Sequence, residues 1–139
     1  MIDDKLNLPQ DDSTEAKKVR KQFIIDFYSN WIAENMTKQI YNESLKDFIN
    51  VRFLSIQETA GHASHTYNST FAVTFLTEIL EKAKQIKSVK PKTENKNQAR
   101  FSEIIVMEHS IADIGSIKLT VGVLKGSKQK VQYCITAIE

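Results

Sequence analysis

The last quarter of the chain alternates apolar and polar residues, and this pattern limits the fold more than any other feature of the sequence. Residues 117–123 and 131–137 both alternate in this way, and a segment with glycine, serine and lysine separates them. Alternation at every second position is typical of a strand with one buried face. The two segments therefore predict an antiparallel β-hairpin.

The faces of this hairpin define its expected register, because a shift of one residue would turn every apolar side chain of one strand to the wrong side. A three-residue loop at 126–128 allows matched faces. Like side chains then pair across the strands: Val121 with Tyr133, Val123 with Val131, Leu119 with Ile135 and Lys118 with Thr136. The second face collects polar side chains: Lys118, Thr120, Gln132 and Thr136.

Upstream of the hairpin, apolar residues recur at helical spacing in three segments. Residues 14–36 carry a broad apolar stripe after the hydroxyl residues 13–14, which can cap a helix. Residues 53–60 predict a short helix that Gly61 ends. A second long helix is expected from Asn68 or Ser69 to about Ile86. The two histidines between these helices would lie in a connection.

Other segments predict strands and a loop. Residues 39–41 and 48–51 are typical of short strands, and the apolar run 101–107 of a longer one. Residues 87–98 are rich in Lys, Asn and Thr and predict an exposed loop. Helices followed by an antiparallel sheet define the expected fold class, which is α+β with N-terminal helices packed on a C-terminal antiparallel sheet of about four strands.

Length and composition indicate one domain. A chain of 139 residues that is 41% apolar can bury a single core. Residues 1–13 contain Pro9 and no periodic apolar pattern, so we expect a flexible leader there and a single domain over residues 14–139. The single cysteine, Cys134, excludes an internal disulfide and fits a buried thiol in a reducing compartment.

The sequence predicts no membrane segment. Its apolar runs are shorter than the roughly 20 residues of a membrane helix. Its first residues lack the cationic and apolar layout of a signal peptide. We therefore expect a cytoplasmic location and no membrane partner.

Positive charge gathers between residues 82 and 100, where seven Lys and Arg residues stand against Glu94. Such a block is either a solvated loop or an arm that faces phosphates, because clustered lysines release counterions from a nucleic acid. Under the second interpretation the nucleic-acid-binding candidates are Lys84, Lys87, Lys90 and Lys92, with Tyr67 as a further contact.

Two of the three histidines, His62 and His65, stand three residues apart. Histidine is the side chain whose usual pKa lies near neutral pH, so the pair suggests acid–base chemistry. A zinc site would need a further ligand, for which Glu58 and His109 are the candidates. The structural alternative is that both imidazoles only cap or hydrogen-bond a loop.

The order of these parts resembles a known group of domains. The segment 56–65, the strand that ends in Met107-Glu108-His109 and the two terminal strands are similar to small domains in the polyvalent proteins of phages and conjugative elements. Those domains resemble the barnase, EndoU, colicin and RelE-like nuclease group. The resemblance implies helices before a four-stranded antiparallel sheet, and a metal-independent ribonuclease that uses histidine, lysine and hydroxyl side chains without a cofactor.

Carried to this chain, the resemblance implies a catalytic set of His62, His65, Lys118, Thr120 and Thr136. The two histidines would serve as base and acid, the ammonium would hold the charged phosphate, and hydroxyls would donate hydrogen bonds to its oxygens. The alternative is a noncatalytic module on the same fold that binds RNA, a protein partner or a neighbouring domain.

Overall fold

The computed structural model describes residues 6–138, in which helices precede most of a β-sheet. Four helices lie within these residues: α1 (Thr14–Glu34), α2 (Phe53–Ala63), α3 (Tyr67–Val73) and α4 (Leu76–Lys82). The strands are β1 (Gln39–Asn42), β2 (Asp47–Asn50), β3 (Lys84–Val89), β4 (Phe101–Ile111), β5 (Gly115–Leu124) and β6 (Lys130–Ala137). The expected α+β class is confirmed.

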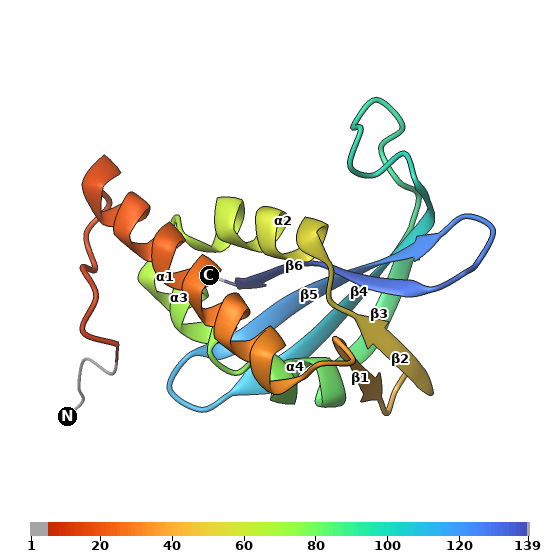
Figure 1. Cartoon of the computed structure of the whole chain (residues 1–139), viewed down its shortest axis with the longest axis horizontal. Coiled ribbons are helices and arrows are strands. Elements are labelled where there is room, and N and C mark those ends of the chain that lie inside the picture. Colours follow the sequence, from red (N-terminus) through yellow and green to blue (C-terminus); the bar gives the residue numbers. More distant parts are fainter. Residues whose placement is uncertain (1–5, 139) are drawn as a thin grey trace.

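The strands form one sheet in the order β1-β2-β6-β5-β4-β3 (Figure 1). The expected sheet of about four antiparallel strands is wrong in both respects, because the sheet has six strands and is mixed. β2 and β6 pair in parallel through Ile49–Lys130 and Asn50–Val131. Two side chains reinforce this short contact: Asn50 Nδ2 donates to the Lys130 carbonyl at 2.9 Å, and Lys130 Nζ donates to Asp47 Oδ2 at 2.8 Å.

α2 and, at the far end, α3 cover the rest of this edge of β6, because β2 pairs with only its first two residues. Figure 1 shows α2 running along β6. Side chains replace the missing strand partner: Ser55 Oγ of α2 donates to the Gln132 carbonyl, and Ala137 N donates to Ser69 Oγ of α3 at 2.8 Å. Unpaired strand edges are normally covered in this way. α2 is thereby fixed beside the sheet edge, with residues available to both faces.

The core has two parts. The larger cluster lies between the helices and the inner face of the sheet, and includes Ile24, Tyr28, Leu80, Leu119 and Ile135. A smaller cluster packs on the outer face: Leu54, Phe101, Ile104, Val131 and Tyr133. Both faces of the sheet therefore carry buried apolar surface, which leaves only part of the outer face open.

The first helix is confirmed, although it ends at Glu34 and not at residue 36. Ser13 caps it as expected, since Ser13 Oγ accepts from Ala16 N at 3.1 Å. The buried side of the helix is turned slightly from the expected stripe, so that Val19 is 46% exposed while Arg20 is fully buried. None of the helices in the described residues has the length and apolar character needed to cross a membrane.

Arg20 is buried because four backbone carbonyls surround its guanidinium. Nε donates to Ser64 O at 2.8 Å, Nη1 to Pro9 O and Asp11 O at 2.7 and 2.9 Å, and Nη2 to His65 O at 3.3 Å. These bonds satisfy a charge that would otherwise be costly to bury. The flexible leader predicted over residues 1–13 falls partly on residues 1–5, which lie outside the described residues.

The prediction of a second long helix that extends to Ile86 is wrong. α3 and α4 occupy residues 67–82, and residues 84–89 form β3, which pairs with β4. The helical path is interrupted after Val73, where Thr74 Oγ1 donates to the Phe71 carbonyl at 2.6 Å and so competes with the helix backbone. Pairing with β4 then outweighs helix propensity and leaves Ile86 55% exposed.

α2 continues past the expected end at Gly61 to Ala63. Gly61 does not adopt the left-handed conformation that ends helices. His62 therefore lies on the last turn of α2, not in a connection as predicted, while His65 lies in the short segment before α3. This difference decides where the two imidazoles can reach.

The β5–β6 hairpin is confirmed, but only part of its register is. Lys118 pairs with Thr136 and Leu119 with Ile135 as expected. The register then shifts, so the predicted partners of Val121 and Val123 are wrong: Val121 pairs with Gln132, and Val123 with Lys130. The connection is also longer than predicted and spans residues 125–129.

This shift turns Gln132 away from the outer face, where it was expected. Gln132 is fully buried on the helix side of the sheet. Its Oε1 accepts from Tyr28 Oη at 2.7 Å, and its Nε2 donates to Thr59 Oγ1 at 2.8 Å. The three side chains connect α1, α2 and β6 through the core.

The loop and strand that precede this hairpin also differ in extent. Residues 87–89 belong to β3, so the exposed loop covers residues 90–100 and not 87–98. β4 runs on to Ile111 and contains His109. The loop rises from the sheet beside the hairpin, where it is the teal segment of Figure 1.

Replacing Gly122 by alanine is expected to destabilise the fold. A Cβ at this position would lie 2.5 Å from three ring atoms of Phe101, which is itself 2% exposed. Overpacking of this kind costs about 1–3 kcal/mol. Urea unfolding monitored by the fluorescence of Trp31, the single tryptophan, measures the loss.

Gly61→Ala is the matched control for this substitution. Gly61 lies inside α2 and a Cβ there would meet nothing within 4 Å, so alanine is expected to raise the free energy of unfolding by about 0.5–1 kcal/mol. Equal stabilities of the two variants would contradict at least one of these two expectations.

Candidate functional site

A pocket of about 370 Å³ lies on the outer face of β4, β5 and β6, between the end of α2 and the loop at residues 90–100. It is called the basic pocket below. Its floor is formed by outward-facing strand residues, since Leu119 and Val121 face the core and their neighbours face outward. The lining residues are His62, Val89, Lys90, Lys92, Gln98, Ile104, Val106, Lys118, Thr120, Tyr133, Cys134 and Thr136.

Four of the five residues predicted as catalytic line this pocket: His62, Lys118, Thr120 and Thr136. The fifth, His65, does not line it. His65 is exposed, and its carbonyl accepts from Arg20 on the far side of the α2–α3 connection. Of the two imidazoles expected at the site, only that of His62 lines the same pocket as Lys118.

The predicted nucleic-acid contacts divide in the same way. Lys90 and Lys92 line the basic pocket, whereas Lys84 and Lys87 lie on β3 and do not. Tyr67 lies at the start of α3, in a different hollow, and its hydroxyl accepts from Leu6 N at 3.2 Å. The positive charge at the pocket comes from the loop and the floor of the sheet.

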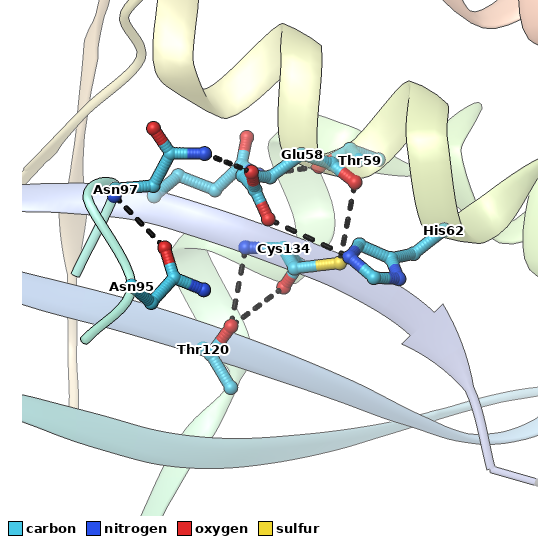
Figure 2. A network of polar contacts seen from close by, with 8 residues as sticks. Glu58, Thr59, His62, Asn95, Asn97, Thr120 and Cys134 are labelled. Carbon is cyan, nitrogen blue, oxygen red and sulfur yellow. Dashed lines mark hydrogen bonds and ion pairs between the residues drawn. The ribbon is translucent and has the colours of Figure 1, made fainter. Parts of the chain in front are cut away.

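Glu58 holds the rim of the pocket together, one helical turn before His62. His62 Nε2 lies 3.5 Å from Glu58 Oε1, and Asn97 Nδ2 donates to Glu58 Oε2 at 2.7 Å. Figure 2 shows this carboxylate between the imidazole and the loop. The Glu58 side chain is 13% exposed and the His62 side chain 64% exposed. The carboxylate thus orients an imidazole that stays open to solvent.

The two floor threonines differ in what they can offer. Thr120 Oγ1 accepts from Cys134 N at 3.1 Å and donates to Cys134 O at 3.4 Å, as Figure 2 shows. Its proton is therefore engaged by β6. Within residues 6–138, the Thr136 hydroxyl takes part in no hydrogen bond and Lys118 in no ion pair. Thr136 and Lys118 face each other across β5 and β6.

Burial sets the protonation of the two other polar groups in the wall. It raises the pKa of the Cys134 thiol to about 12, and the charge of Glu58 acts in the same direction. Burial also raises the pKa of the Tyr133 phenol, again with Glu58 adding to the effect. Both groups therefore stay protonated at neutral pH, and neither serves as an anionic nucleophile.

Glu58 was missed as a partner of His62, although the sequence holds the signal. The two residues are four apart, which places them on the same side of a helix. The signal was lost because the helix was expected to end at Gly61. Tyr133 was also missed, because regular alternation turned it toward the core.

The zinc interpretation finds no support in the arrangement of its candidate ligands. His109 pairs with Glu78, with 2.7 Å between Nε2 and Oε2, and lies in a separate hollow with Lys84 and Glu108. In the part of the chain that the structure describes, no three His, Cys, Asp or Glu side chains are grouped as metal ligands.

Comparison with protein families supports one part of the resemblance inferred from the sequence, the likeness to polyvalent-protein domains, and not the likeness to the nuclease group. The model of the family described as large polyvalent protein-associated domain 3 matches residues 20–129. The chain belongs to this family. The expected membership among polyvalent-protein domains is thereby confirmed. The matched range contains α2 and most of the basic pocket, but it ends before the three lining residues of β6, which are Tyr133, Cys134 and Thr136. No curated protein and no solved structure matches the chain.

The raised pKa of Cys134 predicts a thiol of very low reactivity in this family member. At pH 8 a thiol with a pKa of about 12 is ionised to roughly one part in 10⁴, and only the thiolate is nucleophilic. Alkylation by iodoacetamide, followed by intact mass measurement, should be at least about 100-fold slower in the native protein than in urea. Comparable rates in both states would contradict the burial of this group. Because Cys134 is the single cysteine, the mass change needs no further assignment.

Proposed function

We propose that this domain binds single-stranded RNA in the basic pocket and cleaves it without a metal ion. The observation that carries the proposal is the gathering of one imidazole and three ammonium groups around one pocket: His62, Lys90, Lys92 and Lys118. Ammonium groups suit a phosphodiester, and an imidazole suits proton transfer near neutral pH. Independence from metal is taken from the resemblance to the nuclease group.

The reaction needs two proton transfers and stabilisation of one charged intermediate. The 2′-hydroxyl of a ribose gives its proton to the His62 imidazole, and its oxygen forms a new bond to the adjacent phosphorus. The bond from phosphorus to the 5′-oxygen of the next nucleotide breaks, and the Lys118 ammonium protonates that oxygen. The products are a 2′,3′-cyclic phosphate and a 5′-hydroxyl, and water later returns the protons to their original sites.

The remaining groups hold the reacting phosphate. Lys90 and Lys92 face the pocket from the loop and offset the charge that grows on the phosphoryl oxygens. Thr136 has a hydroxyl proton to donate to one of these oxygens. Glu58 acts through His62 as a positioning residue, because its carboxylate contacts the imidazole and does not line the pocket. Thr120 supports the floor, since its proton is engaged by β6.

Replacing His62 by alanine should lower the rate of RNA cleavage by about 10²- to 10⁴-fold, the usual contribution of a general base. His65→Ala is the matched control, because His65 is three residues away and outside the pocket, and its activity should stay within about twofold. Cleavage of a fluorescent oligoribonucleotide in EDTA measures both variants. An equal loss in the two variants would disprove the assignment of the pocket.

The same assay separates cleavage from binding alone. RNA that is bound but never cut by the unaltered protein would overturn the proposed activity and favour a noncatalytic RNA-binding module. RNA that is neither bound nor cut would favour a protein partner. Requirement for a divalent metal would contradict the metal-independent route.

The salt dependence of RNA binding should identify which lysines contact phosphate. In single-stranded nucleic acid each contact contributes about 0.7 to the slope of log K against log salt. The double variant Lys90→Ala, Lys92→Ala should therefore reduce this slope by about 1.4. Lys84→Ala, Lys87→Ala, which removes the same charge from β3, should leave it unchanged. Fluorescence anisotropy with a 2′-O-methyl RNA, which lacks the attacking hydroxyl, gives both slopes.

If the double variant of Lys84 and Lys87 changes the slope as much as that of Lys90 and Lys92 does, RNA does not bind specifically in the basic pocket. Equal effects would indicate diffuse attraction to the whole charged segment. The contrast between the two pairs is therefore the decisive quantity.

A further inference from the structure

A second pocket of about 310 Å³ lies at the other end of α2, at its N-terminus. It is called the Phe53 pocket below, and the reaction proposed above does not use it. Its lining residues are Arg52, Phe53, Leu54, Gln57, Asn97, Arg100, Phe101, Leu124 and Val131. Its volume lies at the lower end of the range for small-molecule sites.

The Phe53 pocket and the basic pocket are neighbours that share a wall. Asn97 lines the first and the adjacent Gln98 lines the second. Phe101 lines the first and Tyr133 the second, and their rings are in edge contact with 5.8 Å between centroids. The bond between Asn97 and Glu58 crosses from the loop to α2 at this wall. A ligand held on one side therefore lies close to the entrance of the other.

Phe53 is the unusual member of this pocket. Its side chain is 77% exposed, although it opens a helix whose next residue, Leu54, is buried at 8% exposure. Leu54, Phe101 and Val131 line the same pocket and belong to the outer apolar cluster. An exposed ring and a buried apolar lining in one pocket give a planar ligand two surfaces on which to pack.

Charge narrows the choice of ligand. Arg52 and Arg100 both line the Phe53 pocket, and among residues 6–138 no acidic residue does. The Arg52 guanidinium is held by Gln129 Oε1 at 2.6 Å, which fixes it at the rim. A flat apolar slot with cations at its rim matches a nucleobase whose flanking phosphates meet the guanidinium groups.

We infer that the Phe53 pocket takes a nucleobase of the same RNA strand whose phosphate lies in the basic pocket, with the base stacked on Phe53. This inference rests on the proposed function. It adds a recognition step, because the strand is held at two points on either side of the shared wall. The occupant is a base of the strand and not a peptide, since the cationic rim continues into the lysine-lined pocket.

Binding of a 2′-O-methyl RNA pentamer to Phe53→Ala tests the inference. Stacking of one base on an aromatic side chain is worth about 1–3 kcal/mol, so the affinity should fall by about fivefold to 150-fold. Phe53→Trp should retain the affinity, because it keeps an aromatic face. Met36→Ala is the control, since Met36 is 84% exposed and lines neither pocket. The thermal unfolding of all variants is measured alongside.

A second ligand separates stacking from other effects of the substitution. Against pentamers with one abasic site, moved along the strand, the loss caused by Phe53→Ala should vanish at one position. An undiminished loss at every position would overturn the inference, as would an unchanged affinity of Phe53→Ala for the intact pentamer.

Lys118→Ala distinguishes failure of this inference from failure of the proposed function. If Lys118→Ala weakens binding while Phe53→Ala does not, the basic pocket binds RNA and the base subsite is wrong. If neither variant changes the affinity, the proposed function itself fails. If the Phe53 ring instead contacts a protein partner, Phe53→Ala will leave the RNA affinity unchanged, and that result overturns the inference.

Discussion

One extra residue in β6 determines which of its side chains face the helices and which face the basic pocket. The register shifts after Thr120, and Tyr133 is left unpaired as a β-bulge. As a result Gln132 points into the core, where its amide accepts a hydrogen bond from Tyr28 of α1 and donates one to Thr59 of α2. Leaving such a group unsatisfied would cost about 1–3 kcal/mol. Tyr133 and Cys134, in turn, both line the pocket. The bulge therefore joins the packing of the helices to the shape of the site.

The short parallel contact between β2 and β6 also affects both the packing of the helices and the position of the pockets. Because β2 ends after two paired residues, the rest of the β6 edge needs another cover, and α2 supplies most of it, with α3 at the far end. A helix laid along a sheet edge presents residues to both faces. Its inner side enters the core through Ala60 and Ala63, while Leu54 joins the outer cluster. Both pockets consequently open along one helix, with His62 at its end and Phe53 at its start.

Periodic patterns in the sequence predicted the fold class, the first helix and the terminal hairpin, because each depends on side chains that alternate between core and solvent. The bulge leaves no such signal, since Gln132 and Tyr133 simply reverse their expected sides. The segment after Val73 has helical spacing, yet pairing with β4 makes part of it a strand. Glycine commonly ends helices, but α2 continues through Gly61. Lys118 and Thr120 still reach the pocket because the outward face of β5 was assigned correctly, and Thr136 joins them because it pairs with Lys118 as predicted. His62 reaches the same pocket from the last turn of α2.

Glu58 accounts for how so much positive charge can gather at one rim. Three lysines around one pocket repel one another, and repulsion would spread a loop that has no regular secondary structure. Glu58 supplies the opposing charge. One of its carboxylate oxygens lies near the His62 imidazole, and the other accepts a hydrogen bond from Asn97. Gln98 then accepts from the backbone of Lys92 at 2.8 Å, which closes the loop on itself. The carboxylate that orients the imidazole therefore also places the loop lysines, so the two halves of the basic pocket are held by one group.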